Sequence, residues 1–215
     1  MTSETQIEAL IDRLAREDTA ADTFNEYAYD IANNDIRRQN LRLYFGQISR
    51  LMPDTMLVME APGYRGCRLT GVPVTSRKVL LEGVPGLDIF GSKAGYRDVD
   101  EAGFEDIYGE QTATIVWDAL SDLRVLPFIW NTFPFHPCKL GIPRSNRKPR
   151  RAETESGAVF LREVMELWRF QRVIAVGNVA SETLGKIGIN CDKVRHPAQG
   201  GKNEFVAGLK SLFRG

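Results

Sequence analysis

Long hydrophobic runs and clustered cysteines are both missing from this sequence. No run of 18 or more apolar residues occurs, so no transmembrane helix is predicted. The start, Met1 to Glu4, lacks the basic-then-apolar order of a signal peptide. Three cysteines, Cys67, Cys138 and Cys191, stand at wide spacings, which argues against a disulfide framework or a CxxC metal site. They indicate free thiols in a reducing cytoplasm.

An excess of positive charge is also missing, because 28 lysine and arginine residues balance 28 aspartate and glutamate residues. Binding to nucleic acid would therefore depend on local clustering and not on a global positive field. The segment from Lys139 to Arg151 provides such a cluster, since it contains basic residues and no acidic one. Its proline and glycine residues argue against a helix, and a solvated surface is the alternative interpretation of this segment.

Several common catalytic motifs are absent as well. The sequence has no phosphate-binding GxxxxGK[ST] loop, no GxSxG nucleophile elbow, and no dinucleotide fingerprint around Gly177. Its two histidines, His136 and His196, are too far apart in sequence to support a zinc hydrolase site. We expect His136 to be structural. The sequence therefore does not indicate a nucleotide-triphosphate hydrolase, a dehydrogenase or a serine hydrolase.

Strands and helices are predicted to alternate along the chain. Such alternation favours the α/β class: a three-layer α/β/α sandwich around a mainly parallel sheet of roughly four strands. We predict a single domain over residues 1–215, with an N-terminal helical segment (1–52) packed on it. The predicted helices cover residues 3–14, 22–51 with a break at 33–35, 76–82, 115–123, 160–168, 178–186 and 205–213, the strands cover 56–59, 125–130, 173–176 and a short stretch near 194, and a long loop covers 83–109.

Three polar residues fall at the carboxyl ends of predicted strands: Glu60, Asn131 and His196. Ligands of parallel sheets bind beyond these strand ends, so we expect the three side chains to share one pocket. A carboxylate can position a water and stabilise a cationic sugar, an amide can read a base edge, and a neutral imidazole can donate to a developing oxyanion. Each also has a structural interpretation: a turn residue, a strand-end cap and a packed histidine, respectively.

The motifs around these residues resemble the uracil-DNA glycosylase superfamily, and most closely the branch whose first motif reads G-E-A-P-G. The similarity runs in the family's order over residues 55–213. The matching segments are Met59-Glu60-Ala61-Pro62-Gly63 with Thr70-Gly71-Val72-Pro73, then Asn131-Thr132-Phe133-Pro134, Asn146-Arg147-Lys148-Pro149, Val176-Gly177-Asn178-Val179-Ala180 and His196-Pro197-Ala198.

This resemblance implies that the chain removes uracil from DNA by hydrolysing the N-glycosidic bond, without a metal or an organic cofactor. Glu60 would orient the attacking water, Asn131 would recognise uracil, and His196 would stabilise the leaving uracil anion. The resemblance also implies a monomer that acts on DNA without a membrane or an obligate protein partner, cytoplasmic and nucleoid-associated when bound to DNA. The remaining site residues implied are Ala61, Pro62, Gly63 and Val74 around the base, and Arg147, Lys148, Gln199 and Gly200 on the DNA backbone.

The sequence departs from the family pattern at several positions. Met59 replaces a glycine, and Val74 replaces the phenylalanine that stacks on uracil. Either Tyr64, Phe90 or Phe133 supplies the stacking ring, or the base preference differs; glycosylases for hypoxanthine or xanthine and a non-catalytic lesion-binding module remain alternatives. The three cysteines do not match the branch's iron–sulfur ligands. No large apolar wedge follows His196, so either Gln199 fills the gap left by a flipped base or single strands are preferred.

Overall fold

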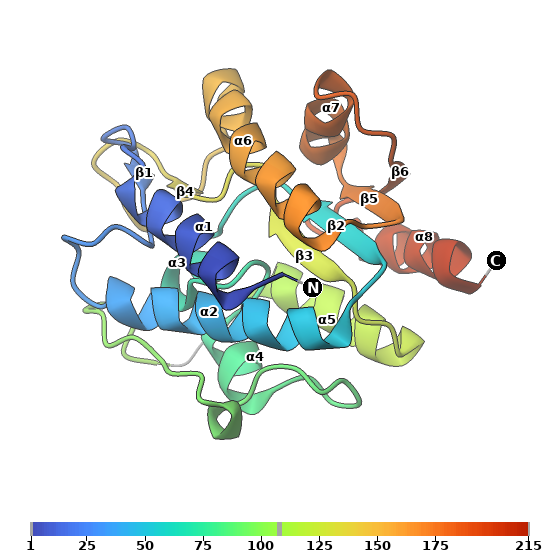
Figure 1. The fold of residues 1–215 in the computed structure, drawn as a ribbon, viewed down its shortest axis with the longest axis horizontal. Helices are drawn as coiled ribbons and strands as arrows, with labels where there is room; N and C mark the ends of the chain where they lie inside the picture. Colours follow the sequence, from blue (N-terminus) through green and yellow to red (C-terminus); the bar gives the residue numbers. More distant parts are fainter. Residues whose placement is uncertain (1, 107–108, 215) are drawn as a thin grey trace.

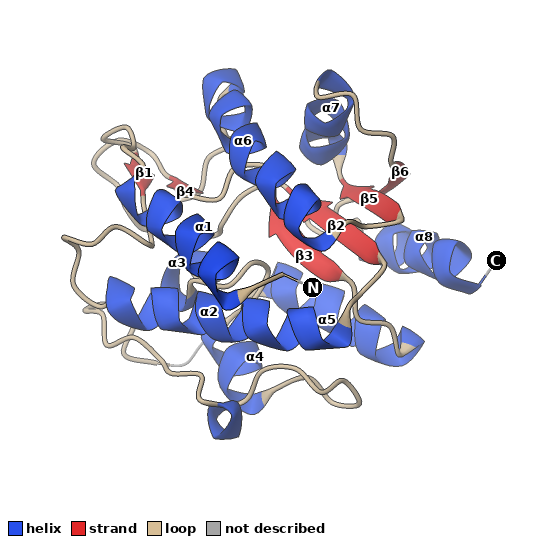
Figure 2. Cartoon of the chain, viewed as in Figure 1, coloured by secondary structure: helices blue, strands red, loops and turns tan. Residues whose placement is uncertain are grey.

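The computed structural model describes residues 2–106 and 109–214, which fold into a sheet covered by helices (Figures 1 and 2). The elements follow one another along the chain as strand–helix alternations after an N-terminal helical part. Their bounds are α1 (Glu4–Arg16), β1 (Thr23–Phe24), α2 (Asn34–Leu51), β2 (Thr55–Met59), α3 (Cys67–Thr70), α4 (Arg77–Glu82), the 3₁₀ helix η1 (Ser92–Ala94), α5 (Gln111–Leu123), β3 (Phe128–Asn131), β4 (His136–Pro137), α6 (Arg151–Trp168), β5 (Arg172–Val176), α7 (Asn178–Lys186), β6 (Asp192–Val194) and α8 (Lys202–Arg214).

The central sheet has four strands in the order β3-β2-β5-β6, and every pair is parallel. Strand β2 is buried at all five positions and β3 at all four, which is the pattern of a parallel sheet covered on both faces. Met59 is paired with Asn131, and Val176 with Val194, so the carboxyl ends of all four strands lie at one edge. The predicted α/β fold class with a mainly parallel four-stranded sheet is confirmed.

Helices cover both faces of this sheet. Helices α6 and α7 pack on each other, and α7 also packs on β2 and β5, while α5 and α8 pack together near β6 (Figure 1). Helix α2 runs beside the edge strand β3, where the Tyr44 hydroxyl accepts the Ile129 N–H at 2.8 Å. The ring of Phe45 packs on those of Phe128 and Trp130. This aromatic packing closes the β3 edge of the core.

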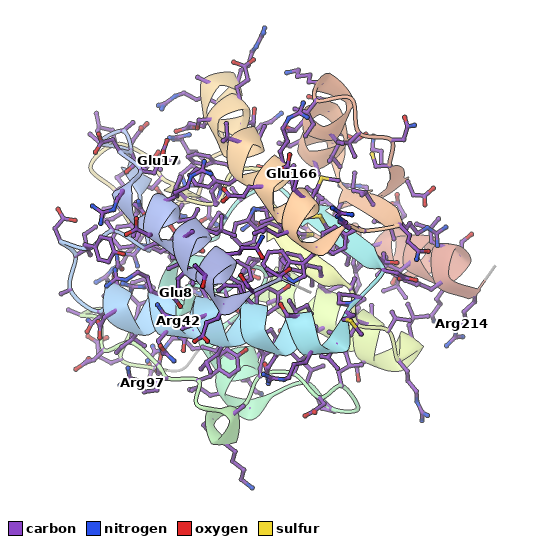
Figure 3. All side chains as sticks on the ribbon, viewed as in Figure 1. Glu8, Glu17, Arg42, Arg97, Glu166 and Arg214 are labelled. Atoms are coloured by element: carbon purple, nitrogen blue, oxygen red, sulfur yellow. The ribbon has the colours of Figure 1, made fainter. Side chains whose placement is uncertain are left out.

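Helices α1 and α2 are joined to each other at the surface. Arg42 donates a hydrogen bond of 2.7 Å to Glu8 Oε2, and Figure 3 shows the two side chains side by side. Helix α1 begins with the capping box that its sequence predicts, because Ser3 and Gln6 exchange hydrogen bonds. Its buried residues, Ile7, Leu10, Ile11 and Leu14 among them, form the expected apolar face. Among the described residues, no helix is long and apolar enough to cross a membrane.

The structure differs from the predicted elements in several places. Residues 22–33 are not helical, because they contain the short strand β1, which pairs with β4 in an antiparallel ladder. Strand β3 begins at Phe128 and not at residue 125, α6 begins nine residues before the predicted start of 160, and α4 begins at Arg77 with Ser76 as its N-cap. The predicted loop of residues 83–109 is irregular apart from η1 and an isolated bridge; residues 107 and 108 lie outside the described part.

Candidate active site

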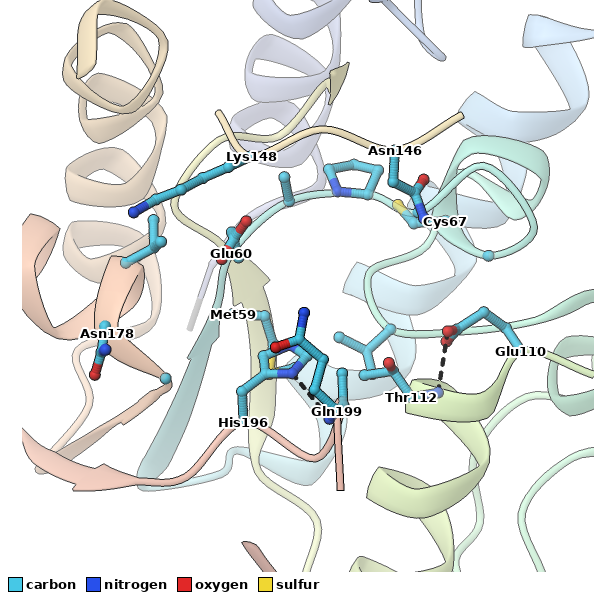
Figure 4. Close-up of a pocket in the computed structure, with 18 of the residues that line it drawn as sticks. Met59, Glu60, Cys67, Glu110, Thr112, Asn146, Lys148, Asn178, His196 and Gln199 are labelled. Carbon is cyan, nitrogen blue, oxygen red and sulfur yellow. Dashed lines mark hydrogen bonds between the residues drawn. The ribbon is translucent and has the colours of Figure 1, made fainter. Parts of the chain in front are cut away.

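A cavity of about 760 Å³ opens at the carboxyl ends of three strands (Figure 4). Glu60 follows β2, Gly177 follows β5, and His196 lies two residues beyond β6; all three line the cavity. Its other walls are the loop of residues 61–67 and the segment of residues 146–148. Of the three residues that were expected to share one pocket, Glu60 and His196 line this cavity.

The backbone of Glu60 is fixed by the end of the neighbouring strand. Its carbonyl oxygen accepts the Thr132 hydroxyl at 2.7 Å and the Phe133 N–H at 3.2 Å. The carboxyl group itself lines the cavity, where burial raises its pKa and the nearby Lys148 ammonium lowers it. Figure 4 shows Lys148 extended above Glu60 from the 146–148 segment. An ionised Glu60 in this place can accept a proton from a water bound in the cavity.

The imidazole of His196 is held in one tautomer. The Ala198 N–H donates to Nδ1 at 3.1 Å, so the neutral ring carries its proton on Nε2. Burial is the main cause that lowers the pKa of His196, and the Arg195 guanidinium lowers it further. His196 is therefore a neutral donor that can hydrogen-bond to a carbonyl oxygen in the cavity.

Gly177 is required for this position of the ring. Its φ angle is +88°, and a Cβ atom added to it would lie 3.1 Å from the Cβ of His196. The strand end and the loop after β6 approach so closely that a side chain at residue 177 would push His196 away. The glycine after this strand, which resembles the family's glycine-ended strand, thus has a direct packing role.

A buried network supports the loop of residues 61–67 from behind. The His136 ring donates from Nδ1 to the Pro62 carbonyl at 2.8 Å, and the His136 backbone N–H donates to Glu26 Oε2 at 3.1 Å. His136 and Glu26 are completely buried, and burial raises the pKa of Glu26 to about 8. The predicted structural role of His136 agrees with these contacts. Glu26 belongs to the segment that was predicted to be helical, and periodicity could not have revealed it.

Among the residues that the structure describes, no phenylalanine, tyrosine or tryptophan ring lines the cavity. Val74 does line it, with a φ angle of +51° and its carbonyl oxygen bonded to the Trp117 indole N–H at 2.7 Å. Phe90 and Phe133 are buried in the hydrophobic core, and Tyr64 packs against Phe104. The three candidate stacking rings are therefore not part of the cavity wall.

Asn131 is not brought to the cavity with Glu60 and His196. It is the last residue of β3, only 2% exposed, and it pairs with Met59, which does line the cavity. Paired residues of neighbouring strands project to the same face, so Asn131 lies one strand beyond Met59 on that face. Its side-chain amide forms no hydrogen bond with another described residue. Its predicted role in base recognition stays a prediction.

The basic residues of the site differ in their exposure and in whether they are paired with carboxylates. Arg147 lines the cavity, yet its guanidinium is 15% exposed and bonded to Glu153 at 2.6 Å and to Asp22 at 3.2 Å. Lys148 is exposed at the cavity. Two further exposed cations, Lys193 and Arg195, line the cavity in and directly after β6 and were not predicted from the sequence. The sequence contains a sign of them, because one cation stands on each side of Val194 just before His196.

The remaining predicted contact residues follow the His196 loop and the first motif. Gln199 lines the cavity with a φ angle of +53°, whereas Gly200 lies outside it with nothing within 4 Å of its Cβ position. Ala61, Pro62 and Gly63 all line the cavity as expected. The loop between Glu60 and the start of α3 therefore contributes its first three residues, and then Gly66, to the cavity wall.

No protein-family model matches the sequence, and no curated protein matches it either. Solved structures do match. The fold is similar to that of the crystal structure of wild-type SMUG2 from Pedobacter heparinus, with a TM-score of 0.64. The two sequences are only 11% identical, but the match covers 98% of this chain and 99% of that chain. The likeness extends over almost the whole of both chains and concerns the fold.

Proposed function

We propose that this chain is a DNA glycosylase that hydrolyses the N-glycosidic bond of a damaged base. The observation that carries the proposal is the pairing of a half-buried carboxyl, Glu60, with a neutral imidazole donor, His196, across one cavity at the strand ends. SMUG2, which shares the fold, is a glycosylase of the uracil-DNA glycosylase superfamily, and this supports the same reaction class here.

In the proposed reaction, the bond between C1′ of the deoxyribose and the base nitrogen breaks with its electron pair leaving on the base. Glu60, ionised, stabilises the cationic sugar and accepts a proton from the water whose oxygen bonds to C1′. His196 donates a hydrogen bond from Nε2 to a base carbonyl oxygen, where the negative charge of the leaving base accumulates. The released base then takes up a proton, and the products are the free base and an abasic site.

We propose uracil as the substrate base, on the strength of the motif resemblance. Hypoxanthine and xanthine remain the alternatives, because a cavity walled by Val74 in place of an aromatic ring does not require the shape of a pyrimidine. Asn131 would read the base only if its surroundings rearranged, since its strand partner Met59 lines the cavity and Asn131 does not. If Asn131 does read the base, Asn131→Ala should lose most of the activity and keep the fold.

The DNA strand would cross the cavity between two groups of cations. Lys148 lines the cavity from the 146–148 segment, and Lys193 and Arg195 line it in and directly after β6. In this arrangement the phosphates on both sides of a flipped nucleotide would each bind a cation. Gln199 would occupy the space beside the vacated base position. Arg147 remains a predicted phosphate ligand, but its observed partners are carboxylates of the chain itself.

The test is an excision assay on single-stranded oligonucleotides that contain uracil, hypoxanthine or xanthine. Treatment with the protein and then with hot alkali is expected to break the strand at uracil. Glu60→Gln keeps the size of the side chain but removes the base, so it should bind the oligonucleotide and lose the cleavage. Cleavage at none of the three bases, or full cleavage by Glu60→Gln, would contradict the proposed reaction.

A further inference from the structure

One side chain at the cavity is oriented in advance as a hydrogen-bond donor. The Tyr64 backbone N–H donates to Oδ1 of Asn146 at 2.9 Å. Since a backbone N–H can only donate, it determines which end of the amide is the oxygen. The Nδ2 group is left with its N–H donors, and it lies 4.0 Å from the Cβ position of Gly63, which also lines the cavity.

The other side-chain amides at the cavity are not fixed in this way. Asn178 and Gln199 also line it, but neither forms a side-chain hydrogen bond with another described residue, so each amide is free to present its oxygen or its nitrogen. Asn146 alone among these three has a determined direction. A preorganised donor discriminates between bases more sharply than a group that can rotate to suit either.

The position of Asn146 decides which part of a base it faces. Figure 4 shows Glu60 below Lys148, and the amide of the exposed Asn146 at the other end of the 146–148 segment, beside Cys67. The glycosidic carbon has to lie near Glu60, because the water attacks there. The part of the base remote from that bond is position 4 of a pyrimidine or position 6 of a purine, and this part then faces Asn146.

We propose that Asn146 selects bases that carry a carbonyl group at pyrimidine position 4 or purine position 6. This inference rests on the proposed function in so far as that function places a base in the cavity. A carbonyl oxygen there accepts the Nδ2 hydrogen, whereas an amino group would leave two donors facing each other without an acceptor. Uracil and hypoxanthine are therefore accepted, and cytosine and adenine are rejected. Xanthine and guanine share the carbonyl at position 6, so Asn146 does not distinguish them.

The experiment measures binding of single-stranded oligonucleotides by fluorescence anisotropy. Each contains one 2′-fluoro nucleotide with uracil or cytosine; the fluorine slows cleavage by destabilising the cationic sugar, and a single strand needs no unpairing. The wild-type protein is expected to prefer uracil by about tenfold, in the range of one good base contact. Asn146→Ala should reduce the preference to within about twofold. Asn146→Asp still accepts the Tyr64 N–H but presents a second acceptor, so it should prefer cytosine.

The control is Asn203→Ala, an exposed position on α8, which should keep the wild-type preference. Equal binding of the two bases by the wild type, or an unchanged preference in Asn146→Ala, overturns the inference. A preference that disappears in Asn131→Ala but persists in Asn146→Ala overturns it too. The excision assay separates the two proposals: a wild type that discriminates in binding but excises no base contradicts the hydrolase and leaves Asn146 as the selecting residue.

Discussion

At the scale of single residues, burial and the Lys148 ammonium have opposite effects on the pKa of Glu60. Burial favours the neutral form of the Glu60 carboxyl, and the Lys148 ammonium favours the charged form. The proposed reaction needs the charged form. In the proposed reaction, Lys148 would therefore help to keep the carboxylate ionised, in addition to any contact with a phosphate.

Removal of Lys148 should shift the pH dependence of excision. The acid limb of the single-turnover rate should follow the ionisation of Glu60, with activity lost as pH falls through its raised pKa. Lys148→Met removes the cause that lowers this pKa, so the limb should move to higher pH. Lys139→Met, exposed in the same basic segment but outside the cavity, is the matched control. Coincident profiles for all three proteins would show that Lys148 does not act on Glu60.

Two glycines at the ends of α7 give a second comparison. Gly177→Ala places a Cβ against His196 at a φ of +88°, so it should lower excision by about tenfold or more through displacement of the ring. Gly185→Ala, inside α7 with nothing within 4 Å of its Cβ position, should leave excision unchanged and stabilise the fold by up to about 1 kcal/mol. Equal activity of the two variants would show that His196 does not need the close approach at Gly177.

At the scale of elements, α6 lies unusually close to the chain after β3. A Cβ atom on Gly157 would lie 2.2 Å from the Thr132 carbonyl oxygen and 2.8 Å from the Cα of Phe133. These residues also hold the Glu60 carbonyl oxygen, through the Thr132 hydroxyl and the Phe133 N–H. The position of Glu60 therefore depends on how closely a helix packs on the end of the neighbouring strand.

Gly157→Ala should consequently destabilise the protein by about 1–3 kcal/mol, the usual range for overpacking, and also reduce excision. The control is Gly46→Ala in α2, where the nearest atom to a Cβ is the end of the Arg50 side chain at 3.9 Å. That variant should be neutral or stabilising in urea unfolding monitored by circular dichroism. If Gly157→Ala were as stable as the wild type, α6 could move away from the chain after β3 without a loss of stability.

The elements also show what the sequence could and could not predict. Apolar runs and helical periodicity were enough for the four sheet strands and most helices, because burial imposes both patterns. The two-residue strands β1 and β4 have no periodicity, so Glu26 was assigned to a helix. Strand ends indicated one edge, but the order β3-β2-β5-β6 decides which residues meet. It places Asn131 on the edge strand β3 beside Met59, and His196 beyond the opposite edge strand β6.

At the scale of the whole molecule, the balance of 28 basic and 28 acidic residues means that the proposed binding of DNA would depend on the cations at the cavity. Affinity for a single strand should fall as salt increases, with a slope set by the number of phosphates neutralised. Lys193→Ala and Arg195→Ala should each weaken binding for all sequences and reduce the slope by about 0.7, the single-strand value for one contact. Lys78→Ala, an exposed position outside the cavity, is the control. An unchanged slope would remove β6 from the DNA footprint.

The strand order has a consequence for how the site is assembled. Glu60 follows the first strand of the central sheet to be synthesised, and His196 follows the last. Strand β2 is interior, and both of its neighbours come later in the chain, so its edges stay unpaired until β3 and β5 have formed. A nascent chain or a fragment that ends before residue 196 cannot contain both residues of the proposed reactive pair. Under the proposed function, the protein would therefore not create abasic sites in DNA before its sheet is complete.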